Sequence, residues 1–190
     1  MTAEDLRMAD LTGRVIGVLQ ADVKTITEIE GDPNAMGQAI TVIVVAGVSG
    51  LIGNYFRVGL TGGVLSLVSS LVGYALFSLL VFLIGTKMMP EPTTKADFSE
   101  TFRTVGFAAA PGVFNILAII PFIGALVPLV TGLWGLVIGV IAVREVLDYS
   151  NTGRAIIVCI IAVVVCWIAL FILLLPILGA AMLAGAAAGR

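Results

Sequence analysis

The stretch FNILAIIPFIGALVPLV, residues 114–130, decides how often this chain crosses a membrane. It is uncharged and strongly apolar, yet it contains Pro121 and Pro128. A proline ring clashes with the preceding helical turn and removes a backbone donor, so a continuous helix resists both residues. The stretch lies in an uncharged block of 40 residues, 104–143. As one helix this block would measure roughly 60 Å, about twice the hydrocarbon thickness of a bilayer. We therefore expect the chain to fold back in the turn PFIGALVP.

The composition predicts an integral membrane protein. Of the 190 residues, 59% are hydrophobic and only 12% are charged, and the mean hydropathy is +1.15. Soluble globular chains carry about 25% charged residues. The net charge of −2 and the lack of a basic stripe argue against nucleic acid as a partner, because neutralising phosphates requires clustered Lys and Arg.

The uncharged blocks predict an all-α, polytopic fold with five transmembrane helices. Blocks 33–56 and 58–86 are each long enough for one span. In the last block, 155–189, Pro176 lies too close to the end for another crossing, so we predict one long kinked span. The membrane domain would cover residues 34–190, with spans at about 34–54, 60–86, 104–121, 126–147 and 153–180.

The positions of the basic residues predict the orientation. Eight of the ten Lys and Arg residues lie in the N-terminal segment, in the connection between spans two and three, or in that between spans four and five. By the positive-inside rule the N-terminus is cytoplasmic and the C-terminus outside. The expected location is the cell (inner) membrane.

The segment before the first span, residues 1–33, predicts a cytoplasmic amphipathic helix. Its apolar residues recur at helical spacing, whereas seven acidic residues outnumber three basic ones. An acidic helix gains nothing from anionic headgroups. We expect its apolar face to pack on the protein's own cytoplasmic surface or on a partner. That face consists of Met8, Leu11, Val15, Val18 and Leu19.

A second short amphipathic helix is predicted at KADFSETFRTV, residues 95–105. Thr94 and Asp97 have the spacing of a capping box at its start. We expect this helix to lie along the interface and to lead into the third span.

Charged residues at the predicted cytoplasmic ends of the spans form a candidate docking site. They could hold a lipid phosphate or a partner's carboxylate. The structural alternative, which we prefer, is that they end helices at the headgroup level. The residues are Lys87, Arg103, Arg144, Glu145, Asp148 and Arg154.

A candidate intramembrane hinge or cavity surrounds the predicted turn. Asn115 could line a cavity, but we prefer an amide that bonds a carbonyl freed by a nearby proline. Gly135 and Gly139 form a GxxxG pattern that permits close helix packing, either within the monomer, which we prefer, or across a dimer interface. The hinge or cavity residues are Pro111, Asn115, Pro121, Gly124 and Pro128.

No pattern in the sequence indicates catalysis. There is no histidine to act as a base, no phosphate-binding Gly-rich Lys motif and no nucleophile elbow. Cys159 and Cys166 are about 10 Å apart along one predicted helix, so they cannot form a disulfide with each other. We expect no enzyme activity, no catalytic residue, no metal site and no cofactor.

Three stretches carry a resemblance to a known family. They are VLQADVKTITEIEGDPNAMGQAI, FSETFRTVGFAAAPGVFNILAIIPFIGALV and LWGLVIGVIAVREVLDYSNTGRAI. Together, in order and spacing over roughly residues 12–175, they resemble the Yip (Ypt-interacting protein) family in its short prokaryotic form. The resemblance implies a multi-pass protein with a cytoplasmic N-terminus. Eukaryotic members associate with Rab-type GTPases and with one another in early secretory trafficking, but this chain lacks their long polar N-terminal region.

Two functional hypotheses follow. The preferred one is a membrane interaction or organising protein that binds protein partners through its cytoplasmic N-terminal helix and loops. The alternative is a small transporter or lipid-handling protein that uses the proline-broken spans three and four. Membrane lipids, cytoplasmic proteins and a second copy of the chain are the expected partners. A polar cavity or lateral groove beside Asn115 and Pro111 would favour the alternative, and a closely packed centre would favour the first.

Overall fold

The computed structural model describes the backbone of residues 3–188 and the side chains of residues 10–173, 175 and 176. Every regular element in the described residues is helical, which confirms the predicted all-α class. The elements are α1 (Ala3–Leu19), α2 (Val23–Gly31), α3 (Ala35–Leu83), the π-helical turn η1 (Ile84–Met88), α4 (Phe98–Phe107), the 3₁₀ helix η2 (Ala110–Ile119), α5 (Leu126–Val146) and α6 (Thr152–Ala188).

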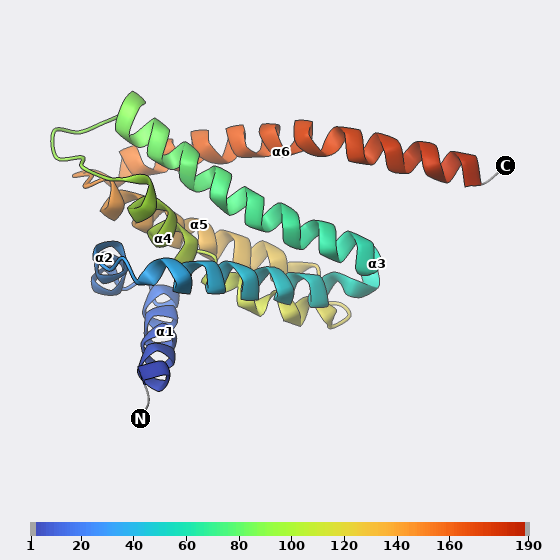
Figure 1. Cartoon of the computed structure of the whole chain (residues 1–190), viewed down its shortest axis with the longest axis horizontal. Coiled ribbons are helices and arrows are strands. Elements are labelled where there is room, and N and C mark those ends of the chain that lie inside the picture. The colour runs from blue at the N-terminus through green and yellow to red at the C-terminus, as the bar shows by residue number, and fades with distance from the viewer. Residues whose placement is uncertain (1–2, 189–190) are drawn as a thin grey trace.

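Helix α3 consists of two arms that meet at Gly59. This residue has φ 65° and ψ −176°, a conformation that essentially only glycine adopts. Figure 1 shows the helix reversing so that its second arm returns beside the first. A Cβ added to Gly47 would lie 2.5 Å from Leu67 Cδ1, so the absence of a side chain lets the arms approach closely. The reversal lies between the predicted spans at 34–54 and 60–86.

Helix α4 begins with a capping box formed by residues other than those predicted. Glu100 N donates to Asp97 Oδ1 at 2.8 Å, and Asp97 N donates to Glu100 Oε2 at 3.0 Å. The Thr94 hydroxyl instead donates to the carbonyl of Leu147 at 2.8 Å. The predicted capping pair was therefore wrong, because Thr94 joins two loops rather than starting the helix. The predicted amphipathic helix is present, but its C-terminal half is buried inside the protein.

The predicted third span is not one α-helix. Helix α4 ends at Phe107 and the chain continues as the 3₁₀ helix η2, which has Pro111 in its first turn. A proline at this position would clash with the carbonyl four residues earlier in an α-helix, which explains the change of helix type. The chain then turns at residues 120–125, where Phe122 has φ 72°, and η2 and α5 pack against each other.

Helices α1 and α2 fold onto the bundle. Leu11, Val15, Val18 and Leu19 of α1 all belong to the hydrophobic core or pack against it. Trp134 Nε1 in α5 donates to the carbonyl of Leu19 at 3.1 Å. The apolar face of the amphipathic helix thus packs on the protein itself, although the side chain of the fifth predicted residue lies outside the described part.

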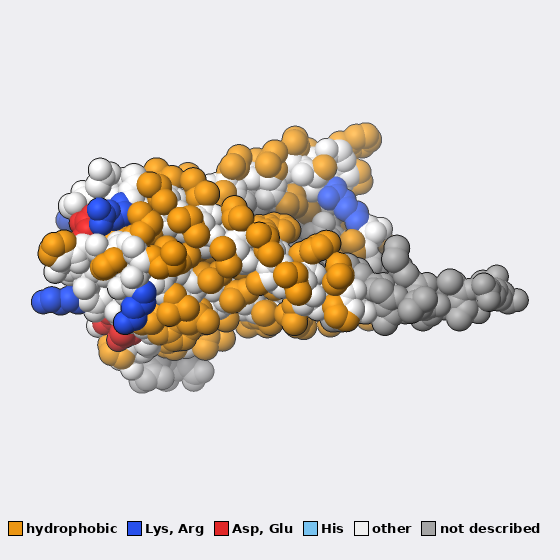
Figure 2. Space-filling view, turned by 90° about the horizontal axis from the view of Figure 1, so that it is seen from above, with side chains coloured by type: hydrophobic (Ala, Val, Ile, Leu, Met, Phe, Trp, Pro, Cys, Tyr) orange, Lys and Arg blue, Asp and Glu red, His pale blue; other side chains and the backbone are white. Residues whose placement is uncertain are grey.

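The outer surface of the bundle is apolar. In the described residues four helical segments are long and apolar enough to cross a membrane, namely Ala35–Met88, Phe98–Ile119, Leu126–Val146 and Thr152–Leu173. The first has 54 residues and includes both arms of α3. Figure 2 shows hydrophobic side chains over the middle of one face, with acidic and basic side chains gathered at one end.

Candidate functional site

At the charged end of the bundle, Arg14 holds the N-terminal helices together. Its side chain is 6% exposed. The guanidinium lies 2.8 Å from Glu28 Oε1 and 2.8 Å from Asp32 Oδ2 on the α2 side, and 3.3 Å from Asp10 within α1. It also donates to Gln38 Oε1 in α3 at 2.8 Å. Burial alone would lower the pKa of Arg14, but the hydrogen bonds to the carboxylates raise it, so the cation is retained.

Arg103 performs a similar role at the end of α2. Its side chain is 5% exposed. Nε donates to the carbonyls of Ile29 at 3.1 Å and Glu30 at 2.7 Å, and the Nη2 group also contacts the Glu30 carbonyl. A cation at a helix C-terminus satisfies free carbonyls and complements the helix dipole. Arg103 therefore joins α4 to α2.

Several carboxylates surround the Glu30 side chain. Burial raises the pKa of Glu30 to about 7, and the charges of Asp148, Glu100 and Glu145 raise it further, while Arg103 acts in the opposite direction. Carboxyl groups from α2, α4 and the end of α5 therefore converge here. Glu30 changes its protonation state close to neutral pH.

Arg154 closes the loops at the same end of the bundle. Its Nε lies 3.4 Å from Glu91 Oε1, and Nη1 donates to the Pro90 carbonyl at 3.2 Å. The guanidinium lies 5.9 Å from the centre of the Tyr149 ring. The Tyr149 hydroxyl donates to the Met89 carbonyl at 2.8 Å. These contacts join the loop before α4 to the loop before α6.

The six predicted docking residues thus have different environments. Arg103 and Arg154 bind other parts of the chain, as described. Lys87 and Asp148 are exposed, whereas Arg144 and Glu145 are partly buried. Arg144 Nε donates to the Tyr149 carbonyl at 3.4 Å. The structure does not gather the six residues into one exposed patch.

Sequence reasoning missed the two residues with the most notable charged environments, Arg14 and Glu30. Arg14 counted only toward the positive-inside rule. Its carboxylate partners Glu28 and Asp32 are 14 and 18 residues away, and the turn between α1 and α2 brings them together. Helical spacing could not have indicated this contact.

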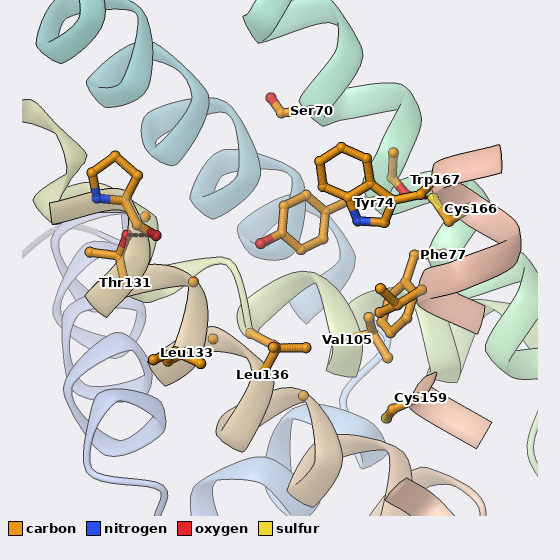
Figure 3. A pocket seen from close by; sticks show the side chains of 18 of the residues that line it. Ser70, Tyr74, Phe77, Val105, Thr131, Leu133, Leu136, Cys159, Cys166 and Trp167 are labelled. Carbon is orange, nitrogen blue, oxygen red and sulfur yellow. Dashed lines mark hydrogen bonds between the residues drawn. The ribbon is translucent and has the colours of Figure 1, made fainter. Parts of the chain in front are cut away.

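A groove lies on the side of the bundle among the second arm of α3, the α4–η2 segment, α5 and α6. It encloses about 590 Å³, within the usual range for small-molecule pockets. Leu133, Leu136 and Trp167, which line it, are 57%, 47% and 73% exposed, so it opens between α5 and α6. Figure 3 shows these side chains around the opening. We call it the lateral groove.

The predicted hinge residues lie at different depths around this groove. Asn115 and Pro128 line both the lateral groove and a neighbouring cavity of about 250 Å³. Pro111 is buried, Pro121 is exposed, and Gly124 is buried in the turn. Asn115 therefore lines a cavity, and the alternative that we preferred from the sequence was wrong. Its Oδ1 accepts from the Thr131 hydroxyl at 2.7 Å, and in the described part of the chain its amide nitrogen has no hydrogen-bond partner.

The two glycines of the GxxxG pattern have unequal surroundings. A Cβ on Gly135 would lie 3.3 Å from the Ala108 carbonyl, so α5 approaches the end of α4 closely there. A Cβ on Gly139 would have no neighbour within 4 Å among the described atoms. Gly139 lines the lateral groove, and its missing side chain contributes to the open volume.

The cysteines also line the lateral groove. Cys159 and Cys166 are buried free thiols, and Cys166 Sγ lies 3.6 Å from the Gly73 carbonyl. Within the described residues no group of three or more His, Cys, Asp and Glu residues could hold a metal ion.

The long apolar helices, with polar groups confined to the ends and to the groove, define an α-helical membrane protein. Comparison with known families makes this more specific, because residues 16–175 match the Yip1 domain. The match covers most of the chain, so the chain belongs to the Yip1 domain family, and the predicted resemblance is confirmed. The comparisons matched no curated protein and no solved structure.

Proposed function

We propose that the protein crosses the cell (inner) membrane five times, with its N-terminus in the cytoplasm and its C-terminus outside. The two arms of α3, the α4–η2 segment, α5 and α6 would be the spans. The reversal at Gly59 supports counting α3 twice, because the arms are antiparallel. The concentration of Lys and Arg residues in connections that meet at one end supports the orientation.

We propose that the protein binds membrane lipid in the lateral groove and has no enzyme activity. The observation that carries this proposal is the open, mainly apolar groove of about 590 Å³ beside Asn115 and between α5 and α6. An empty space of this size would be costly, because its walls lack packing partners. Lipid chains are the molecules that surround a laterally open groove in a bilayer, so an acyl chain is the natural occupant.

A glycine substitution tests this proposal. Gly139→Leu would place a side chain in the open space of the groove without a clash at Cβ. Gly37→Leu is the matched control, because a Cβ there also has no neighbour within 4 Å and Gly37 does not line the groove. Purified protein in nanodiscs would be labelled with a phosphatidylcholine that carries a photoactivatable group on its acyl chain. We expect labelling of α5 and α6 peptides at the groove to fall in Gly139→Leu and to remain in Gly37→Leu. Equal labelling of both variants would refute the proposal.

A second candidate function is docking of a protein partner on the N-terminal helices and loops at the cytoplasmic end. The observation that favours it is the outward surface of α1 and α2, where Ile16 and Val23 are 49% and 43% exposed. Asp22, Glu28 and the exposed Asp10 lie on the same two helices, so the proposed partner would present an apolar surface with basic residues around it. A second copy of the chain is the other occupant to be tested.

Photocrosslinking distinguishes these occupants. A crosslinking residue placed at Ile16 in cells should capture a protein partner or another copy, whereas one at the buried Val18 should not. Absence of any adduct specific to Ile16 would count against docking at this surface.

A further inference from the structure

Two polar atoms in the wall of the lateral groove have no partner in the protein. In the described part of the chain, neither Tyr74 Oη nor Asn115 Nδ2 has a hydrogen bond, while every fully buried side-chain nitrogen or oxygen has one. Both atoms therefore have accessible surface, and both residues line the groove. Figure 3 shows the Tyr74 hydroxyl pointing toward the side of the pocket where Thr131 lies. The Thr131 hydroxyl engages Asn115 Oδ1 at 2.7 Å, which leaves the amide N–H groups as the free end.

These atoms belong to a longer polar strip. Ser66, Ser70 and Tyr74 are spaced four residues apart on the second arm of α3, so they share one face of that helix. All three line the smaller cavity, and Asn54 from the first arm joins them there. The strip therefore extends from the groove toward the reversal of α3. Its groups are hydroxyls and amides.

Neither cavity has a charged residue in its described lining. Tyr74 is near the middle of the second arm, about 20 Å along the helix axis from either end. At that depth a phosphate would lose its hydration with no cation to compensate. An uncharged group with a carbonyl or hydroxyl oxygen would gain hydrogen bonds from the two free donors.

This inference rests on the proposed lipid-binding function. We propose that the groove selects an uncharged lipid, one with an ester carbonyl or hydroxyl such as a diacylglycerol, over phospholipids with the same chains. Tyr74 Oη and Asn115 Nδ2 hold the ester or hydroxyl oxygen. One acyl chain lies against the apolar part of the wall, which includes Phe77, Leu136 and Trp167.

A comparison of two probes tests the selectivity. Nanodiscs of phosphatidylcholine would contain either a diacylglycerol with a photoactivatable chain or a phosphatidic acid with the same two chains. We expect the diacylglycerol to label groove peptides at least fivefold more than the phosphatidic acid. Tyr74→Phe should reduce the diacylglycerol labelling about fivefold, the order expected for one hydrogen bond. Because the Tyr74 hydroxyl has no protein partner, the variant should fold normally. Tyr55→Phe is the matched control, since Tyr55 is 47% exposed and lines neither cavity.

The outcomes separate the two proposals. Equal labelling by both lipids, with no effect of Tyr74→Phe, would overturn the selectivity while leaving lipid binding intact. Labelling by neither lipid, or labelling that Gly139→Leu does not reduce, would overturn lipid binding in the groove and the selectivity with it. Loss of diacylglycerol labelling in Tyr74→Phe but not in Tyr55→Phe would support both.

Discussion

Replacing Arg14 with alanine should release the N-terminal helices from the bundle. The guanidinium contacts Asp10, Glu28, Asp32 and Gln38, so one side chain links α1, α2 and α3. Removing a buried partner from a charge pair costs about 3–5 kcal/mol when the remaining charge stays buried. The carboxylates here retain access to water, with 45%, 59% and 26% of the side chains of Asp10, Glu28 and Asp32 exposed. We therefore expect a smaller loss of about 2 kcal/mol.

Amide hydrogen exchange is the suitable assay, because the change concerns local opening of α1 and α2 rather than unfolding of the membrane domain. A loss of about 2 kcal/mol corresponds to roughly thirtyfold faster exchange in these helices. Exchange in α5 and α6 should not change. Lys24→Ala provides a control, because Lys24 is an exposed cation on α2. If Arg14→Ala and Lys24→Ala had the same exchange in α1, the proposed clamp would be refuted.

Three further predictions concern other parts of the fold. Burial and neighbouring carboxylates raise the pKa of Glu30 to about 7, so the stability that this group contributes is complete below the unfolded pKa of about 4.3 and is lost as the pH rises toward neutrality. Glu30→Gln should remove this dependence and raise the thermal midpoint at pH 8, by roughly 1 kcal/mol of stability after allowance for solvent screening, whereas an unchanged pH profile would contradict the assignment. Gly59→Ala should lower the thermal midpoint by the equivalent of about 1–3 kcal/mol because its φ is 65°, while Gly37→Ala in a helical position should not; equal midpoints would exclude backbone strain at the reversal. Arg144→Gln with Arg154→Gln should alter topology or partner capture while the protein still folds, as measured by reporters fused to each end; correct insertion with an unchanged interaction profile would count against a docking role.

The sequence was informative about segments that depend on local rules. The two prolines of the opening stretch placed the turn between η2 and α5, since proline sterics act within a few residues. The periodicity of residues 11–19 placed the apolar face of α1. The same periodicity could not reveal that Arg14, on the polar side, is buried against α2. For Asn115 the local argument failed, because the carbonyl it was expected to bond lies within its own helix and its partner is Thr131 in α5.

By itself, the sequence determined the class of this protein, the helices that form it and the family to which it belongs. Hydropathy, charge positions and proline positions are properties of neighbouring residues, so they are legible along the chain. Only the tertiary structure decided where the helices leave space. The lateral groove exists because Gly139 of α5 faces open space between elements that are far apart in sequence. Its free donors, Tyr74 Oη and Asn115 Nδ2, come from different helices, and only folding brings them to one wall.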